Sequence, residues 1–484
     1  MDAVTASTTV AAPLLVGHHT SLMHGWVPVL VQALTAVLLV LAIGWRSRNW
    51  RALWVPVAVA FGTAVAASAH WYIDNHGLTD EPAPHTLWLW IALTGTAAAV
   101  MFFGWQSARR WRRAASISAL PLCLLSSVLV LNGWVGYFPT VQNAWNQLTA
   151  GPLPDQTDKA SVKAMADERA LPARGSVVEV TIPATASHFK HRGELVYLPP
   201  AWFASDPPPK LPTVMMIGGE FNTPADWLRA GDAVKTIDDF AAAHGGQSPI
   251  LVFVDSGGAF NNDTECVNGA RGNAADHLSK DVVPFMVSNF GVSPDRSKWG
   301  IVGYSMGGTC AVDLTVMHPD LFSAFVDIAG DLAPNSGTKA QTIARLFGGN
   351  AGAWAEFDPT TVMIKHGRYS GVSGWFAVNT TGSPAEHRNI HVADMGAVGS
   401  GRPRAAGSRS EQTVAAESLC GVGRGHGIDC AVIGQPGKHD WPFAGRVFTT
   451  ALPWLAGQLG TQGVERTLLP TVSLPAPRPS HRGP

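Results

Sequence analysis

Four long apolar runs in the first third of the chain constrain its fold more than any other feature. They cover about Val27–Trp45, Leu53–Tyr72, Leu87–Trp105 and Ile117–Val135, and no Asp, Glu, Lys or Arg interrupts them. Each is close to the roughly 20 residues that an α-helix needs to cross a bilayer. We therefore expect residues 1–137 to form a membrane domain with four transmembrane helices. Because no ionisable pair lies within the runs, an ion pathway is not indicated.

The connections between the runs predict the orientation of these helices. The first and third connections are rich in arginine, whereas the second, residues 74–86, contains acidic residues and no Lys or Arg. The arginines are Arg46, Arg48, Arg51, Arg109, Arg110, Arg112 and Arg113. Basic connections stay on the cytoplasmic side of a membrane. Everything after residue 137 is therefore expected outside the cytoplasm.

Composition argues against nucleic acid as a partner. It also divides residues 138–484 into a linker, a soluble domain and a tail. The 484 residues carry a net charge of −1, whereas a nucleic-acid-binding protein carries a basic surplus. His18, His19 and His24 have no Cys, Asp or Glu close by, so we expect no metal site there and no cofactor. Residues 138–175 are polar and proline-containing, as in a linker. A soluble domain is expected over residues 176–463, followed by a Pro-rich disordered tail over residues 464–484.

Short β-type runs alternate with helical runs from Ser176 onward. The expected strands are Val177–Ile182, Glu194–Leu198, Thr213–Ile217, Ile250–Asp255, Trp299–Val302, Ala324–Ile328, Gly374–Val378 and Cys430–Ile433. The expected helices are Trp227–His244, His277–Asn289, Thr309–His318, Gln412–Leu419 and Phe443–Leu459. The first two strands are expected to pair antiparallel. Alternation of this kind predicts an α/β fold with a mostly parallel sheet covered by helices on both faces.

One strand-to-helix junction in this domain has a chemical signature. From Trp299 to Gly308 the sequence is Trp-Gly-Ile-Val-Gly-Tyr-Ser-Met-Gly-Gly, an apolar strand that runs into Gly-x-Ser-x-Gly. On such a turn the serine is strained and exposed, and the glycines let strand and helix pass closely. We expect Ser305 to be a nucleophile and the amide of Met306 to face the oxyanion that forms on an attacked carbonyl. The motif alone is weak, so partners are needed.

A serine nucleophile requires a base, and His439 is the expected one. In hydrolases of this architecture the histidine follows the last strand, and Gly434 to Trp441 follows the run Cys430–Ile433. Besides His481 in the Pro-rich end, five other histidines come after Ser305, and we expect these five at a helix end or in solvated segments. They are His318, His366, His387, His391 and His426.

The acid that orients the histidine is less clearly marked. It is expected after the strand Gly374–Val378, but the next seven residues contain no carboxylate, and Glu386 is the first that follows. We expect Glu386 to be the acid. The alternatives are Asp394, Glu411, Glu417 and Asp331.

The loop after the strand Thr213–Ile217 is expected to complete the oxyanion hole. Hydrolases of this kind take their second amide donor from the loop after the third strand. In this chain that loop begins Gly218-Gly219-Glu220. We expect the amides of Gly219 and Glu220 to join that of Met306.

Four of the five cysteines fall in the part expected outside the cytoplasm. An even number there predicts disulfides, and we expect Cys266 to pair with Cys310 and Cys420 with Cys430. Cys123 lies in the fourth apolar run, where it is expected to be a small reduced core residue.

Three separated blocks together resemble a known family. They are Gly303–Gly308, His318–Phe322 and Gly437–Trp441, and they look like the blocks of the putative-esterase family, which includes esterase D-type enzymes, feruloyl esterases and mycolyltransferases of actinobacterial cell walls. The resemblance covers about residues 176–460 and implies an α/β-hydrolase fold with a triad that contains Ser305 and His439. The mycolyltransferases are similar also in the Ser-Met turn and in a tryptophan shortly after the Gly-Gly loop, here Trp227. They lack a four-helix anchor.

These features predict a membrane-anchored, extracytoplasmic serine esterase. Its expected partner is an ester substrate from a lipid or a cell-wall glycolipid, and the aromatic-containing insertion Leu332–Ser373 could cover an acyl group. Two alternatives stay open. The acyl-enzyme could pass its acyl group to a sugar or lipid hydroxyl, or the fold could be a non-catalytic scaffold.

Overall fold

The protein consists of two compact units. The computed structural model describes residues 20–76, 83–149, 153–380 and 410–470. A helical unit is formed from Met1–Ala66 and Pro84–Gly151, and a sheet unit from Ala67–Ala83 and Pro152–Pro484. Most of the Pro-rich end that is expected to be a disordered tail lies outside the described residues.

The helical unit is built from long apolar helices. These are α1 (Trp26–Ile43), α3 (His85–Gly104), α4 (Arg110–Val135) and the part of α2 (Val55–His76) up to Ala66, beyond which α2 is assigned to the sheet unit. A π-helical turn, Trp50–Trp54, leads into α2, and the short α5 (Val141–Leu148) follows α4. Among the described residues, four helices are long and apolar enough to cross a membrane, with mean hydropathy of at least 1.7 over an 18-residue window. Three arginines of the third connection lie within the first turn of α4, so that helix begins earlier than expected.

Side chains in the helical unit are distributed as in a membrane protein. Thr35 and Ser126 are fully buried, and their hydroxyls lie 3.3 Å apart between α1 and α4. Large apolar side chains such as Val40 and Phe102 are more than half exposed on the outside. Helices in lipid pack through small and hydroxyl side chains and leave large apolar ones facing the acyl chains.

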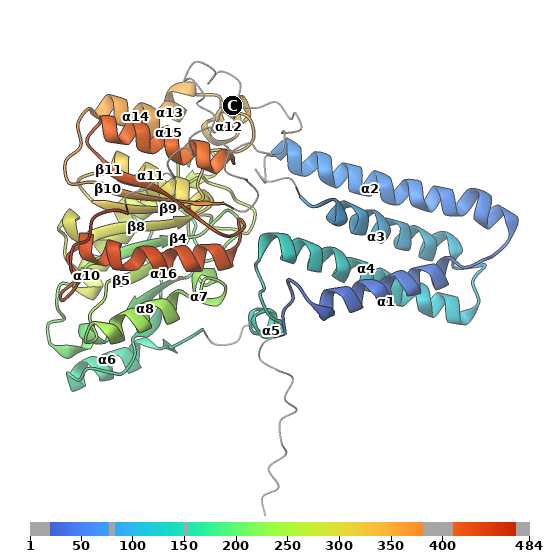
Figure 1. Ribbon diagram of the computed structural model, residues 1–484, viewed down its shortest axis with the longest axis horizontal. Helices are drawn as coiled ribbons and strands as arrows, with labels where there is room; N and C mark the ends of the chain where they lie inside the picture. Colours follow the sequence, from blue (N-terminus) through green and yellow to red (C-terminus); the bar gives the residue numbers. More distant parts are fainter. Residues whose placement is uncertain (1–19, 77–82, 150–152, 381–409, 471–484) are drawn as a thin grey trace, which may run out of the picture. The chain divides into compact units, whose positions relative to one another are not determined.

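The sheet unit contains a nine-stranded sheet within the described part of the chain (Figure 1). Its order is β1-β2-β3-β5-β4-β8-β9-β10-β11. The strands are β1 (Gln156–Thr157), β2 (Ser176–Val180), β3 (Glu194–Leu198), β4 (Thr213–Ile217), β5 (Ile250–Val254), β8 (Trp299–Tyr304), β9 (Ala324–Ile328), β10 (Ser373–Asn379) and β11 (Asp429–Gln435). From β5 to β11 all neighbours are parallel, and β3 is antiparallel to both β2 and β5. The expected antiparallel opening pair is confirmed.

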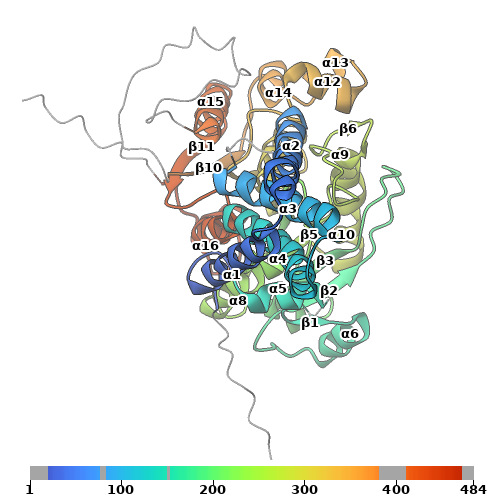
Figure 2. The ribbon, with the colours of Figure 1, turned by 90° about the vertical axis from the view of Figure 1, so that its right-hand side faces the viewer.

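Helices cover both faces of this sheet. A Cβ on Gly300 of β8 would meet Leu455 of α16 (Trp441–Gln458), whereas one on Gly303 would meet Gly307 of α11 (Met306–Met317). Residues three apart on a strand point to opposite faces, so α16 and α11 lie on opposite sides. Figure 2 shows α16 and α8 (Ala233–Ala243) on the left and α9 (Ala274–Asp276) and α10 (Val283–Phe290) on the right. This is the doubly covered α/β arrangement that the sequence predicts.

The structure differs from the expected elements in three places. The helix expected over Trp227–His244 is divided into α7 (Asp226–Arg229) and α8, because Asp232 has φ 51° and breaks the hydrogen-bonding run. The expected linker contains β1, which pairs with β2, and α6 (Lys159–Glu168). The insertion Leu332–Ser373 holds three helices, α12 (Lys339–Phe347), α13 (Ala351–Ala355) and α14 (Pro359–His366).

Candidate active site

Ser305 lies at a sharp turn between β8 and α11. Its backbone has φ 58° and ψ −125°, a conformation that is costly for a residue with a side chain. The Ser305 amide donates to the carbonyl of Ile328 in β9, and its carbonyl accepts from the amide of Gly308 at 2.7 Å. A Cβ on Gly303 would lie 1.6 Å from the carbonyl oxygen of Gly307, so this position requires glycine. These features are those of the nucleophile turn that the motif predicts.

His439 lies beside this turn. It belongs to the loop between β11 and α16, and its ring centroid is 5.1 Å from that of Tyr304, the residue before Ser305. Asp440 follows as the N-cap of α16, and its carboxylate accepts from the amide of Phe443 at 2.9 Å. The cap fixes the backbone next to His439. Trp441 packs against both Tyr304 and the fully buried Trp227, so an aromatic cluster supports the loop.

The loop Gly218–Asn222, called the oxyanion loop below, passes directly against Ser305. A Cβ on Gly219 would lie 3.3 Å from Cβ of Ser305. The Gly219 amide donates to Oδ1 of Asn222 at 2.8 Å, so this amide already has a partner. Neither the Glu220 amide nor the Met306 amide makes a hydrogen bond with another described residue. Of the two amides expected from this loop, that of Glu220 is the one available to a ligand.

The side chain of Glu220 is an unusual neighbour for an oxyanion. Burial, and then the nearby carboxyl of Asp263, raise the pKa of Glu220 to about 8, against a smaller opposing effect of Arg271. Asp263, Arg271 and Ser336 are among the residues that line the cavity at this point. The Glu220 carboxyl is therefore neutral at pH 7, which avoids a negative charge next to the turn.

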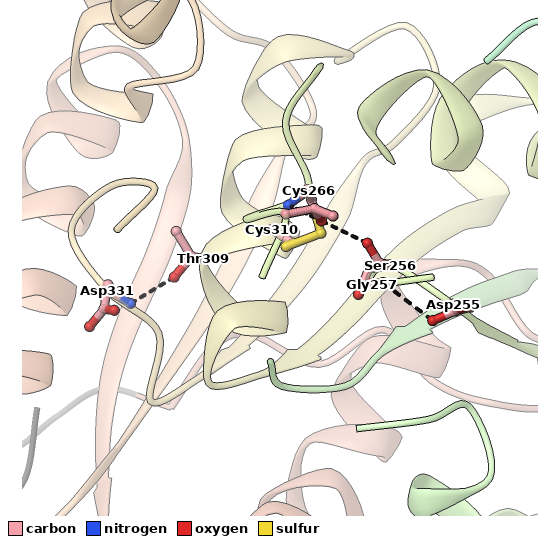
Figure 3. The surroundings of a disulfide bond; sticks show 8 residues. Asp255, Ser256, Gly257, Cys266, Thr309, Cys310 and Asp331 are labelled. Atoms are coloured by element: carbon pink, nitrogen blue, oxygen red, sulfur yellow. Dashed lines mark hydrogen bonds between the residues drawn. A yellow bond between two sulfur atoms is a disulfide. The ribbon is translucent and has the colours of Figure 1, made fainter. Parts of the chain in front are cut away.

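The expected acid lies outside the described residues, as does Asp394. Of the described alternatives to Glu386, Glu411 and Glu417 are exposed residues of α15 (Glu411–Gly425), and Asp331 follows β9. The Asp331 amide donates to the hydroxyl of Thr309 in α11 at 2.9 Å (Figure 3). The assignment of the acid stays a prediction.

Two disulfides lie in the sheet unit, and they join the pairs that the sequence predicts. Cys266 is bonded to Cys310, which ties the loop after β5 to α11, and Cys420 is bonded to Cys430. Figure 3 shows the first disulfide beside Ser256 and Gly257, at the start of that loop. Cys123 is a free, buried cysteine. The helix α11 that follows Ser305 is thus covalently joined to the loop after β5, a strand separated from β8 by β4.

A cluster that could geometrically hold a metal ion lies among His191, Glu194 and His277, whose ligand atoms are within 4.8 Å of one another. Both ring nitrogens of His191 instead face backbone carbonyl oxygens, those of Arg192 and Ile182, at 2.8 Å. His277 lies between two carboxylates. The ring nitrogens of both histidines thus already have oxygen partners within the protein.

The chain is similar to several known proteins. Residues 190–419 match the model of a family described as Putative esterase. An uncharacterized protein of Corynebacterium glutamicum is 27% identical over 376 residues, which cover 75% of this chain and 86% of that protein. The MPT51 antigen of Mycobacterium leprae is 28% identical over 169 residues, covering 32% and 52%.

A solved S-formylglutathione hydrolase from Agrobacterium tumefaciens is 16% identical and covers 60% of this chain and 97% of that one, with a TM-score of 0.45. The strand order, the strained serine turn and the family match agree with one another. The sheet unit is therefore an α/β-hydrolase and a serine hydrolase, and over residues 190–419 it is similar to the putative-esterase family.

Proposed function

We propose that this protein is a membrane-anchored extracytoplasmic esterase that cleaves a carboxylic ester of a lipid or cell-envelope component. The observation that carries the proposal is the strained backbone conformation of Ser305. This residue lies at the C-terminal end of β8, beside the loop that contains His439. Strain of this kind presents a serine hydroxyl to a substrate and is retained where the surrounding structure enforces it.

In the proposed reaction Ser305 Oγ attacks the ester carbonyl while His439 accepts its proton. The negative oxygen of the tetrahedral intermediate accepts hydrogen bonds from the amides of Met306 and Glu220. The C–O bond to the leaving alcohol then breaks, and His439 returns the proton to that alcohol. Water resolves the acyl-enzyme by the same two steps, with Glu386 proposed to orient the imidazole.

Two features of the chain support placement of this chemistry on the outer face of a membrane. The four apolar helices have the length and hydropathy to anchor the protein. Both disulfides lie in the sheet unit, and disulfides persist in oxidising compartments. A catalytic unit held at such a surface would meet amphipathic esters, which is why we propose a lipid or envelope substrate.

Labelling with a fluorophosphonate probe tests the proposal. The full chain in detergent should be labelled at Ser305, and neither Ser305→Ala nor the heat-denatured protein should react. By analogy with other triads, Ser305→Ala and His439→Ala should each lower turnover about a millionfold. A folded wild-type protein that resists the probe would instead indicate the non-catalytic scaffold.

Acyl transfer is the second candidate, and it is favoured by the mycolyltransferase-like Ser-Met turn. The same acyl-enzyme would then be resolved by a sugar or lipid hydroxyl. Incubation of the enzyme with a lipid ester, with and without added sugars, distinguishes the two. A new sugar ester formed at the expense of free acid would establish transfer.

A further inference from the structure

The oxyanion loop is held closed by Asn222. The Asn222 amide donates to the carbonyl of Gly219 at 3.1 Å, and its side-chain oxygen accepts from the Gly219 amide at 2.8 Å. With the Gly219 amide occupied, the Glu220 amide is left for the oxyanion. The position of Asn222 therefore determines which amide of this loop faces Ser305.

Asn222 is itself held from outside the loop by Arg192. Nη2 of Arg192 donates to the carbonyl oxygen of Asn222 at 2.7 Å. Arg192 precedes β3 and lies 30 residues before Asn222 in the sequence, and 26% of its side chain is exposed. A long side chain from the segment before β3 thus contacts the backbone of the oxyanion loop.

The guanidinium of Arg192 is in turn fixed by Asp255. Nε and Nη2 of Arg192 donate to the two carboxylate oxygens of Asp255 at 3.0 and 2.6 Å, and the Arg192 amide donates to Oδ2 at 2.6 Å. Asp255 is 1% exposed and directly follows β5. Its burial would raise its pKa, but the hydrogen bonds from Arg192 and Gly258 outweigh this and lower the pKa. The carboxylate is therefore ionised and immobile.

We propose that Arg192 is a positioning residue for the reaction of Ser305. Held in a two-point contact by Asp255, it fixes the carbonyl of Asn222 and with it the Glu220 amide at the oxyanion site. This inference rests on the proposed function. An arginine is suited to this role because its planar guanidinium has five N–H donors. It can donate two hydrogen bonds to the carboxylate of Asp255 and a further one to the carbonyl oxygen of Asn222.

The size of the expected effect follows from what is displaced. Loss of one oxyanion donor costs about a hundredfold to a thousandfold in kcat in well-studied hydrolases. A loop that is released but not removed should lose part of this, about tenfold to a hundredfold. The ester should still bind, because the binding surface away from the oxyanion is unchanged, so KM should change by less than about threefold.

The experiment compares Arg192→Lys, Asn222→Ala and the double variant in the full chain. Arg192→Lys keeps a positive charge for the buried Asp255, since removal of that charge could prevent folding. Asn222→Ala leaves the Arg192–Asp255 pair intact. The matched control is Arg296→Lys, because the side chain of Arg296 likewise donates to the backbone of distant segments, the carbonyl oxygens of Pro319 and Ser370. Arg296 lies just before β8, at the opposite end of that strand from Ser305. Rates are divided by the concentration of active sites from fluorophosphonate titration.

Both single variants should lose kcat at nearly constant KM, and the double variant should lose little more than the larger single loss, because both changes release the same loop. Arg296→Lys should keep wild-type kcat per active site. A kcat per active site unchanged in Arg192→Lys and Asn222→Ala would overturn the inference, as would multiplicative losses in the double variant. Failure of the proposed function is a separate result, because the wild type itself would then be unlabelled and inactive.

Discussion

At the scale of single residues, the charge state of Glu220 is the feature with the clearest consequence for a reaction at Ser305. Its amide is the proposed second oxyanion donor, and its side chain is held neutral at pH 7 by burial. If the Glu220 carboxyl ionises, its negative charge lies close to the developing oxyanion, because the backbone amide of the same residue is the proposed oxyanion donor. Repulsion between two like charges at such short range in a partly buried site costs several kcal/mol at most, and about 1 kcal/mol where water screens them.

We predict that esterase activity falls as the pH rises through about 8, the raised pKa of Glu220. The neutral form predominates below that pH and the carboxylate above it, so kcat should drop about tenfold between pH 7 and pH 9. A pH–rate profile of Glu220→Gln should lack this alkaline decline and keep the acidic decline that belongs to His439. An identical alkaline decline in the glutamine variant would contradict the prediction.

Asp440 offers a second test at this scale. It caps α16 immediately after His439. Asp440→Ala should lose about 0.5–2 kcal/mol of stability through the cap and should also lower kcat, because the backbone that carries His439 is freed. Asp440→Asn retains a capping oxygen and should restore both quantities. Urea unfolding together with turnover measures this, and a kcat loss that asparagine does not restore would assign Asp440 a different role.

At the scale of elements, buried charges join β3 to the π-helical segment His277–Val282 that follows α9. His277 is fully buried; its Nε2 lies 3.0 Å from Glu194 of β3, and its Nδ1 lies 3.4 Å from Asp281. Burial lowers the pKa of His277, but the hydrogen bonds and charges of Glu194 and then Asp281 outweigh this, so the pKa is raised overall. The carboxylate of Asp281 also accepts hydrogen bonds from the backbone amides of Ala186 and Ser187. In its protonated form, His277 can therefore join β3, the π-helical segment and, through Asp281, the backbone at Ala186 and Ser187.

We predict that this contact is lost at alkaline pH. The pKa of His277 is higher in the folded state than in the unfolded state, so its contribution is fully present below pH 6.5 and is lost as the pH rises through the folded value. The free energy of unfolding should decline with pH above neutrality in the wild type. Ionisation of Glu220 also lowers the free energy of unfolding as the pH rises, because its folded-state pKa is raised as well. The measurement is therefore the difference in free energy of unfolding between the wild type and His277→Gln across pH 6–9. A constant difference would refute the role of His277.

The same scale shows which elements the sequence could predict. The central strands were predicted to within two residues because their apolar runs are continuous, as in Thr213–Ile217, where every residue is buried. The division of α7 from α8 depends on a positive φ at Asp232, which has no periodic signal. β1 has two polar residues and pairs only because the neighbouring edge is open.

The candidate site was predictable where chemistry is local in the sequence. Ser305 and Met306 lie in a motif with a fixed backbone geometry, and His439 follows from strand order. The contact of Arg192 with Asn222 and Asp255 spans 30 and 63 residues. No spacing rule connects such residues, so only the folded sheet reveals them.

At the scale of the whole molecule, the boundary between the two units determines what can fold alone. Contacts place Pro152 and everything after it in the sheet unit. Val162 of α6 belongs to the main core of the sheet unit, and Leu153 is also buried. The segment that follows the four apolar helices thus contributes to the core of the sheet unit.

We predict that a fragment of residues 153–470, made in an oxidising host, folds without the helical unit. It contains all nine strands of the described sheet and both disulfides. A shorter fragment, residues 170–470, should fold but be less stable by about 2–4 kcal/mol, because it lacks β1 and the buried Leu153 and Val162, each contributing roughly 1.5–2 kcal/mol. Urea unfolding with matched slopes measures the difference. Equal stability of the two fragments would place β1 and α6 outside the unit, whereas aggregation of both, with a folded full chain, would show that the helical unit is needed for folding.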